Sequence, residues 1–285
     1  MNHLFKTATA YLLGRDRANR YFSVYPDDTF VVSYPRSGST WSRFLIANLV
    51  FPDNEVSFAN IDRFVPATAS LSRRALARVP RPRIIKCHNY FDHRYNNVIY
   101  IVRDPRDVVL SEYRFVLKRR VIPDFYPIEQ FVARFIKGEV NNYCSWRESV
   151  GTWMAARNGS ERFLLLRYED MVSDTVAELG KVASFLKIKA TPDRLERAVE
   201  RSSSDRMRAM EQSQSEAWVV TRGGREDVPF VGAAKSGQWK TALPPSCVKL
   251  IEDAWGPIMQ ELGYRSTAPG ADIAPTSAAI IRGSR

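Results

Sequence analysis

Short apolar runs alternate along the chain with longer amphipathic segments. Four runs typical of buried strands span residues 29–34, 83–87, 97–102 and 162–167. Seven longer segments have the apolar spacing of helices, at residues 39–50, 105–118, 128–137, 143–157, 174–186, 193–200 and 245–262. Because strands that alternate with helices form parallel sheets with crossover helices, the pattern predicts an α/β fold with a central parallel sheet flanked by helices.

The two ends of the chain differ from this body. Residues 1–28 contain one short apolar stretch, at 8–13, which is too short and too polar-flanked for a secretory signal. It predicts an N-terminal helix that packs on the domain or precedes it. From residue 266 onward Ala, Pro, Gly, Ser and Thr dominate, which predicts a disordered tail over 266–285. A single folded domain is therefore expected over residues 29–265, without internal repeats.

Composition narrows the class of protein. The chain has 285 residues, of which 45% are hydrophobic, and this is enough for one sizeable core. The sequence contains no run of 18 apolar residues, so we expect no transmembrane segment. The three cysteines lie far apart and suggest no disulfide framework, which favours a reducing, cytoplasmic location. With only three histidines, a transition-metal site is not expected.

The chain is strongly basic, with a formal net charge of +11. Such a charge attracts polyanions, so nucleic acid is a partner to consider. The basic residues are spread along the chain, and the densest groups, such as residues 118–120, are interpreted as solvated surface. No repeat of aromatic and basic residues supports nucleic-acid binding. A non-catalytic basic protein remains an alternative, but it leaves the strand-end residues described below unexplained.

The most informative segment is residues 29–41, TFVVSYPRSGSTW. An apolar strand runs into a tight turn that opens a helix, and a helix N-terminus offers free N–H groups and a positive dipole end to an anion. Gly38 lets the backbone approach closely, and Arg36 adds a cation. Further hydroxyl donors come from Ser37, Ser39 and Thr40. The alternative is an ordinary strand-to-helix turn. The segment is not a nucleotide-triphosphatase P-loop, because no Gly precedes Gly38 at the spacing of that motif and no Lys follows it.

A second strand, at 97–102, also delivers a cation to a helix start. Arg103 follows this strand directly, Asp104 is a typical helix cap before proline, and Ser111 lies two turns into the helix. Ligands of open α/β sheets bind at the carboxyl edge of the strands, so Arg103 and Ser111 are candidate anion ligands. The alternative is that Arg103 pairs with Asp104 or Asp107 as a local salt bridge.

The strand between these two motifs ends in Lys86, Cys87 and His88. A hydroxyl group that accepts a transferred group must lose its proton, and an imidazole near its reference pKa of about 6.5 can take it. His88 is therefore the candidate general base. The alternative is a surface or capped histidine. His93 is the competitor and ranks second because it lies beyond the strand end.

Together these motifs resemble the sulfotransferases that use 3′-phosphoadenosine 5′-phosphosulfate (PAPS). Residues 34–41 are similar to the family's 5′-phosphosulfate loop, with Arg36 in place of Lys and Ser39 in place of Thr. Arg103 and Ser111 match the family's 3′-phosphate motif. Residues 86–88 match a Lys-Thr-His segment whose His is the general base, with Cys replacing Thr.

The resemblance continues toward the C-terminus. Tyr168 matches a Tyr-Glu-Asp segment whose Tyr contacts adenine. Ser202 matches a residue that faces the nucleotide, while Ser204 replaces a common adenine-stacking aromatic. Residues 237–240 are similar to a Gly-Asp-Trp-Lys segment, which ends a loop that closes over the 3′-phosphate.

That loop departs from the family pattern at its start. The usual Arg-Lys-Gly is replaced by residues 232–234, Gly-Ala-Ala. Lys235, or Arg222 and Arg225, are the cations expected to compensate. The departure affects the expected affinity for the cofactor.

The resemblance spans about residues 30–264 and implies a P-loop-kinase-like sulfotransferase fold. It implies transfer of the sulfuryl group from PAPS to a hydroxyl, or less readily an amine, by in-line displacement. His88 would act as the base, while Lys86 and Arg36 balance the developing charge without a metal. Residues expected to contact the cofactor are Arg36, Ser37, Gly38, Ser39, Thr40, Trp41, Arg103, Ser111, Tyr168, Ser202 and Lys235.

Two matters stay open at this point. The acceptor is expected to be a small molecule, glycan or lipid that bears a hydroxyl, with a sugar, lipid, phenol or peptide all open. Aromatic residues such as Tyr90, Tyr95 and Phe125 could line its pocket, but the core is favoured for most of them. The oligomeric state has no signal. A P-loop-like kinase is a further alternative, which would need carboxylates for Mg²⁺, with Asp104 and Asp107 as candidates.

Overall fold

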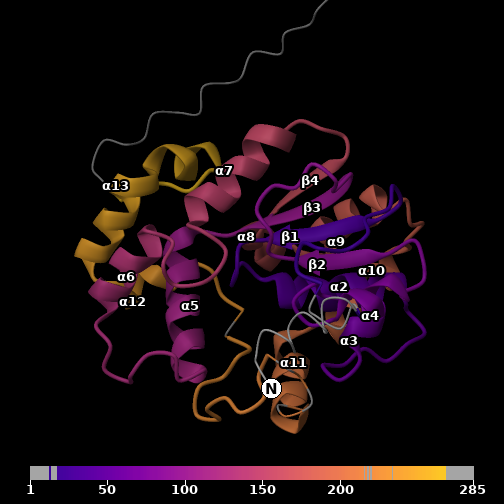
Figure 1. The fold of residues 1–285 in the computed structure, drawn as a ribbon, viewed down its shortest axis with the longest axis horizontal. Coiled ribbons are helices and arrows are strands. Elements are labelled where there is room, and N and C mark those ends of the chain that lie inside the picture. Colours follow the sequence, from indigo (N-terminus) through magenta and orange to yellow (C-terminus); the bar gives the residue numbers. More distant parts are fainter. Residues whose placement is uncertain are drawn as a thin grey trace, which may run out of the picture.

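The core of the molecule is a four-stranded parallel sheet (Figure 1). The computed structural model describes residues 13, 18–214, 216, 218, 220–232 and 234–267. The strands follow the order β2-β1-β3-β4. They comprise β1 (Thr29–Ser33), β2 (Ile84–Cys87), β3 (Asn97–Val102) and β4 (Phe163–Arg167). All four predicted strands are present and begin and end within one residue of expectation, and the α/β fold with a parallel sheet is confirmed.

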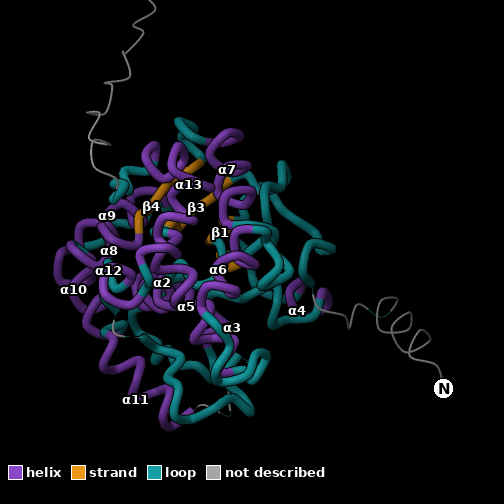
Figure 2. Tube along the Cα trace, turned by 90° about the vertical axis from the view of Figure 1, so that its left-hand side faces the viewer, coloured by secondary structure: helices purple, strands orange, loops and turns teal. Residues whose placement is uncertain are grey.

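Helices surround this sheet, as Figure 2 shows. They are α2 (Ser39–Val50), α3 (Ile61–Phe64), α4 (Arg73–Ala77), α5 (Pro105–Lys118), α6 (Ile128–Ile136), α7 (Trp146–Arg157), α8 (Tyr168–Ser173), α9 (Thr175–Phe185), α10 (Pro192–Arg201), α11 (Ser204–Gln214), α12 (Trp239–Ala242) and α13 (Pro245–Glu261). Helices α2 and α5 have the bounds that the sequence predicts. Helix α7 starts at 146 rather than 143, because Cys144 has a positive φ of 61° and the Ser145 hydroxyl caps the Glu148 N–H.

The pleat of the sheet divides the core into two layers. Phe30 and Val32 of β1 face one hydrophobic cluster, which contains residues of α5, α6, α7 and α13. Val31 faces the other cluster, which contains residues of α2, α9 and α10. Successive strand residues point to opposite faces, so both sides of the sheet are buried and the strands are almost continuously apolar.

This architecture brings the carboxyl ends of β1, β2 and β3 to one edge. Each end leads into a motif singled out above: the turn before α2, Lys86 with His88, and Arg103 before α5. Asp104 caps α5 by accepting a hydrogen bond from Arg106 N at 2.9 Å, with Pro105 at the first helical position. Two capped or turn-initiated helices therefore point their N-termini toward the same edge.

Both termini of the described body pack against it. Ala18 N donates a hydrogen bond to Leu71 O at 2.9 Å, and Ala18 is fully buried. At the other end Thr267 N donates to Glu252 Oε2 at 3.1 Å. All but residue 13 of the predicted N-terminal helix around residues 8–13 lies outside the described residues, as does the tail from 268. Ser266 and Thr267, predicted as the start of a disordered tail, are instead bonded to Glu252. Among the described helices, none is long and apolar enough to cross a membrane.

Candidate active site

A cavity of about 620 Å³ opens at the carboxyl edge of the sheet. Its size is within the range of ligand sites. The walls come from the ends of β1, β2 and β3, from α2, α5 and α8, and from the segment that leads into α12. Of the predicted site residues, the cavity is lined by Arg36, Gly38, Ser39, Thr40, Trp41, Lys86, His88, Arg103, Ser111, Tyr168, Ser202 and Lys235. The structure therefore gathers almost all of the predicted site in one place.

The turn between β1 and α2 is shaped by Gly38 and Tyr168. Gly38 has a φ of +96°, and a Cβ atom at this position would lie 2.5 Å from Cδ2 of Tyr168. Glycine is therefore required both for the backbone conformation and for the aromatic ring beneath the turn. Gly38 is also the N-cap of α2, where no side chain caps the first turn. The free N–H groups of that turn are available to an anion.

Arg36 lies on the same turn with its guanidinium inside the protein. Its Cζ is 4.7 Å from the ring centre of Phe115 and 4.6 Å from that of Phe230. Its Nε donates a hydrogen bond to Ser111 Oγ at 3.2 Å. Burial lowers the pKa of Arg36 to about 10, and the charge of Glu112 partly opposes this shift. At neutral pH Arg36 is therefore a cation held between two aromatic rings, next to the hydroxyl assigned to the 3′-phosphate.

Arg103 reaches the cavity from the end of β3. Its Nη1 donates to Arg36 O and its Nη2 to Lys235 O, both at 3.3 Å, and its Cζ lies 4.2 Å from the ring centre of Tyr168. Asp107 is the nearest carboxylate, with 3.9 Å between Arg103 Nη2 and Asp107 Oδ2. Asp104, the other partner considered above, does not pair with Arg103. The ion pair of Arg103 is thus long and leaves the guanidinium directed at its backbone partners around the cavity.

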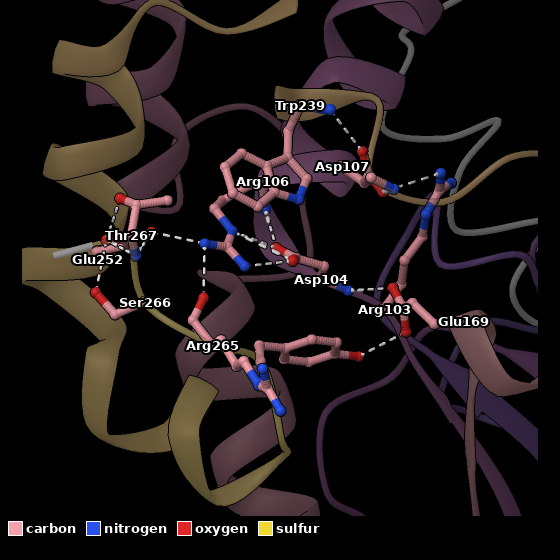
Figure 3. Close-up of polar contacts among 12 residues, drawn as sticks. Arg103, Asp104, Arg106, Asp107, Glu169, Trp239, Glu252, Arg265, Ser266 and Thr267 are labelled. Carbon is pink, nitrogen blue, oxygen red and sulfur yellow. Dashed lines mark hydrogen bonds and ion pairs between the residues drawn. The ribbon is translucent and has the colours of Figure 1, made fainter. Parts of the chain in front are cut away.

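The carboxylates near the start of α5 hold the adjoining segment in place (Figure 3). Asp107 accepts hydrogen bonds from Gly237 N at 2.6 Å and from Trp239 N at 3.0 Å. Asp104 accepts from Arg106 Nη2 at 2.7 Å, and the Cζ of Arg106 lies 3.7 Å from the ring centre of Trp239. Both carboxylates are therefore occupied, and together they anchor the start of α12 beside Arg103.

Lys86 and His88 form a contact pair at the end of β2. His88 Nδ1 lies 2.8 Å from Ser33 O, so this nitrogen carries the proton and donates it to the carbonyl. His88 Nε2 is therefore the acceptor, and Lys86 Nζ lies 2.5 Å from it. The ring of Tyr143 contacts His88 edge-on, with 5.3 Å between ring centres. The imidazole is thus fixed in one tautomer with its basic nitrogen toward Lys86.

Burial perturbs both groups of this pair. Loss of hydration, and then the charge of Arg43, lower the pKa of Lys86 to about 7. Loss of hydration, and then the charge of Lys86, hold the pKa of His88 well below its usual range. The expectation of an imidazole near its reference pKa is therefore wrong, because the sequence reveals neither the burial of this imidazole, which lowers its pKa most, nor the contact with Lys86. His88 is neutral at physiological pH.

His93 lies elsewhere. It is exposed in the loop after β2, its carbonyl accepts a hydrogen bond from Arg157 Nη2 at 3.3 Å, and it does not line the cavity. Of the two histidines that compete for the role of base, only His88 is placed beside Lys86 and the turn before α2.

Trp41, Tyr168 and Ser202 form a second wall. Trp41 and Tyr168 meet edge-on at 5.8 Å between ring centres, and Trp41 Nε1 donates to Ser202 O at 3.0 Å. The Ser202 hydroxyl is occupied, since it accepts from Asn48 Nδ2 at 3.0 Å and donates to Ala198 O at 2.8 Å. Ser202 is therefore in the wall without a free hydroxyl, whereas Ser203 and Ser204 line the cavity beside it.

The three cations expected to compensate for the missing Arg-Lys-Gly lie in different surroundings. Lys235 lines the cavity, whereas Arg222 and Arg225 do not. Arg225 Nη2 is paired with Asp227 at 2.5 Å, and a further ion pair links Arg225 to Asp124. Arg222 Nε donates to Glu216 O at 2.8 Å. Neither Arg222 nor Arg225 lies where its charge could replace the missing cations, so the expectation that they compensate is wrong. Residue 233 lies outside the described residues.

Several cavity residues were not anticipated from the sequence. They are Arg114, Asn141, Tyr143, Trp218 and Phe230. Their signal is weak, because they come from loops or from exposed helix positions without a motif. The aromatic residues named above for an acceptor pocket lie elsewhere: Tyr95 stacks on Phe30 at 3.7 Å in the core, and Phe125 is 96% exposed.

The donor set of the cavity fits an anionic nucleotide. Arg103 Nε is buried at the cavity without a hydrogen-bond partner among the described residues. Ser37 Oγ is likewise buried and unpartnered on the turn before α2, although the predicted cofactor residue Ser37 does not line the cavity. Native structures rarely leave buried donors unpaired, so donors in this position indicate a ligand. The described residues include no group of His, Cys, Asp or Glu side chains that could hold a metal ion.

The known proteins with similar sequences described below are named sulfotransferases. The family model described as the sulfotransferase domain matches residues 26–263. Sulfotransferase 1E1 of Rattus norvegicus is 27% identical over 248 residues, which cover 81% of this chain and 83% of that protein. The 3-alpha-hydroxysteroid sulfotransferase of Cavia porcellus is 30% identical over 203 residues, which cover 67% of this chain and 70% of that protein.

Two solved structures have a similar fold. Mouse sulfotransferase SULT7A1 complexed with PAP has a TM-score of 0.67 and 22% identity, with coverage of 85% of this chain and 88% of that chain. Retinol dehydratase in a complex with retinol and PAP has a TM-score of 0.71 and 19% identity, with coverage of 88% and 86%. The fold predicted from the motifs is therefore confirmed.

Proposed function

The chain belongs to the sulfotransferase family, and on that premise we propose that it transfers the sulfuryl group of PAPS to a hydroxyl group of an acceptor. The family resemblance read from the motifs is confirmed by the match over residues 26–263. Two structures with a similar fold are complexes with PAP, the product that PAPS leaves after transfer. We propose PAPS as the sulfuryl donor and assign the roles of individual residues below.

One observation carries the proposal: three parallel strands end around a single cavity with complementary groups. The turn before α2 supplies N–H groups and Arg36, β2 supplies Lys86 and His88, and β3 supplies Arg103. Cations and helix N-termini suit phosphate and sulfate groups. A neutral imidazole in the same cavity suits the removal of a proton. This combination matches sulfuryl transfer better than simple anion binding, which needs no base.

The cations would neutralise the charge that develops during transfer. Bound PAPS would supply the sulfuryl group: the bond between its sulfur and the 5′-phosphate oxygen would break as the acceptor oxygen bonds to sulfur, and PAP would be the leaving group. Arg36 and the N-terminus of α2 would hold the 5′ side of the cofactor, and Arg103 with Ser111 would hold its 3′-phosphate. Lys86 would balance charge near the leaving oxygen. Preorganised groups of this kind act by electrostatic stabilisation, as in phosphoryl transfer.

His88 would take the acceptor proton at Nε2. The carbonyl of Ser33 fixes its Nδ1–H at 2.8 Å, so Nε2 has a free electron pair in the neutral ring. Lys86 Nζ lies 2.5 Å from that nitrogen. For His88 to act as a base, Lys86 must turn from Nε2 toward the bound anion. The acceptor hydroxyl would then take the place of Lys86 against Nε2.

The acceptor is proposed to be a small molecule with a hydroxyl group. The similar protein of Cavia porcellus is named a 3-alpha-hydroxysteroid sulfotransferase, and hydroxysteroids are small molecules that bear a hydroxyl group. Ala67, Ala69 and Ser70 line the cavity with small side chains, and Tyr143 lies against His88. These residues leave room near the base for an acceptor of modest size.

A transfer assay tests the proposal. The purified chain is incubated with sulfur-35-labelled PAPS and a panel of phenols, hydroxysteroids and sugars, and labelled products are separated by chromatography. We expect label in at least one hydroxyl acceptor and release of PAP in equal amount. Absence of PAP binding together with absence of transfer would contradict the proposal.

A kinase is the less suitable second function. Its Mg²⁺ ligands would be Asp104 and Asp107, but Asp104 is bound to Arg106 and Asp107 to the N–H groups of Gly237 and Trp239. Dependence of any activity on Mg²⁺ and ATP would be the result that favours it.

A further inference from the structure

Beside Ser111, the rim of the cavity carries two cations that no carboxylate neutralises. Arg114 follows Ser111 by one turn of α5 and lies on the same face of this helix. Lys235 lies opposite, on the segment before α12. Both line the cavity, and within the described ranges neither forms an ion pair. An unneutralised pair of cations at a cavity rim suits an anionic ligand.

A neutral side chain holds Arg114 in this position. Arg114 Nη1 donates a hydrogen bond to Gln238 Oε1 at 3.1 Å. Gln238 Nε2 in turn donates to Lys235 O at 3.3 Å. An amide orients the guanidinium without cancelling its charge, which a carboxylate at the same place would do.

The same carbonyl connects this pair to Arg103. Lys235 O accepts from Arg103 Nη2 at 3.3 Å as well as from Gln238. Asp107 holds the backbone of this segment through Gly237 N, and Figure 3 shows this carboxylate reaching toward Arg103. Arg103, Lys235, Gln238 and Arg114 are therefore linked in one chain of contacts that lines the same cavity as Ser111.

Other cations of the neighbourhood are engaged elsewhere. Arg225 is paired with Asp227 and Asp124, and Lys118 Nζ lies 3.3 Å from Glu211 Oε1. Neither of these side chains is free to move its charge to Ser111 without breaking an ion pair. The partner of Arg114 among the described residues is the neutral side chain of Gln238.

We propose that Arg114, oriented by Gln238, binds the 3′-phosphate of the cofactor and supplies charge that the segment at 232–234 lacks. Together with Arg36, whose Nε donates to Ser111 Oγ at 3.2 Å, and with Arg103 and Lys235, it lines one cavity with four cations, which suits a phosphate dianion better than Arg103 alone. This inference rests on the proposed function, because it assumes that a 3′-phosphorylated nucleotide enters the cavity. It concerns selectivity for the 3′-phosphate and assigns Arg114 no part in the transfer step.

Calorimetric titration with two nucleotides tests the proposal. PAP carries the 3′-phosphate and 5′-AMP lacks it, so the ratio of their dissociation constants isolates this group. Arg114→Ala should weaken PAP about five- to tenfold, a modest value because Arg114 is exposed, and should change 5′-AMP less than about twofold. Arg222→Ala removes a cation outside the cavity and is the matched control, which should leave both constants unchanged.

A second variant keeps the contact but cancels the charge. Gln238→Glu keeps an oxygen for Arg114, removes the Nε2 donor to Lys235 O and adds a negative charge, so it should weaken PAP in the same direction and spare 5′-AMP. Melting temperatures of all variants should stay within a few degrees of wild type, since Arg114 and Gln238 are not core residues.

The outcomes separate this inference from the proposed function. If wild-type protein binds PAP but Arg114→Ala has the same ratio of constants, the inference is overturned and the proposed function stands. Equal weakening of PAP and 5′-AMP also overturns it. If wild-type protein binds no PAP, the proposed function fails and the inference fails with it.

Discussion

Removal of the His88 imidazole is the most informative perturbation of the proposed mechanism. In His88→Ala the turn before α2, Arg36 and Arg103 keep their positions, because none of the hydrogen bonds described for them involves His88. The variant should therefore bind PAP as wild type does. Turnover should fall, because proton removal contributes in the transition state and not to cofactor binding.

The size of the loss follows from the surroundings of His88. General-base catalysis contributes about 10²–10⁴-fold. The pKa of His88 is held well below its usual range by burial and by Lys86, so the base is fully deprotonated at pH 7 but is a weak one. We therefore expect the lower part of the range, about 10²–10³-fold in kcat. This corresponds to about 2.7–4.1 kcal/mol at 1.36 kcal/mol per tenfold.

The assay is steady-state release of PAP with a saturating acceptor, together with calorimetric titration of PAP. His93→Ala is the control, because His93 is exposed and outside the cavity. Its kcat should stay within about twofold of wild type, as for a surface substitution. If His93→Ala is the inactive variant and His88→Ala the active one, the assignment of the base is refuted. Loss of PAP binding in His88→Ala would also refute the separation of roles.

Three further predictions concern other parts of the site. The pKa of Lys86 is lowered to about 7, so its charged form is present below this pH and lost above it. The value of kcat/KM for PAPS should therefore fall as the pH rises through about 7, and Lys86→Arg should remove this limb of the pH profile. Gly38→Ala should lower the free energy of unfolding in urea by about 2 kcal/mol or more, because its Cβ would meet Tyr168, whereas Gly159→Ala, with a positive φ but open space, should lose less. Arg103→Ala should reduce the preference for PAP over ATP by about tenfold in calorimetry, and an unchanged preference would contradict its assignment to the 3′-phosphate.

The sequence was most informative where local chemistry decides the structure. Helix α5 has its predicted bounds because Asp104 and Pro105 form a start signal that depends on neighbouring residues alone. The strands were found because a sheet buried on both faces requires continuous apolar runs. Helix α11 was missed since the run SDRMRAMEQSQ has no clear apolar face. Helix α8 was missed because it begins directly at the end of β4.

The candidate site was predictable as a set of residues but not as a geometry. Motifs at three strand ends placed Arg36, His88 and Arg103 at one edge, because parallel strands share their carboxyl edge. The contact between Lys86 and His88, and the pKa shifts that follow, depend on side-chain packing. The role proposed for Arg114 depends on a loop more than 100 residues away in the sequence, which no local pattern reveals.

The most direct measurement of the central claim is thermal unfolding of the purified chain with PAP and, separately, with ATP at the same concentration. A ligand that binds the native state raises the melting temperature by mass action. The cavity should favour PAP, because Arg103 and Ser111 are placed for a 3′-phosphate that ATP lacks. We expect a clear rise with PAP and a smaller one with ATP. No rise with PAP, or an equal rise with both nucleotides, would contradict the account.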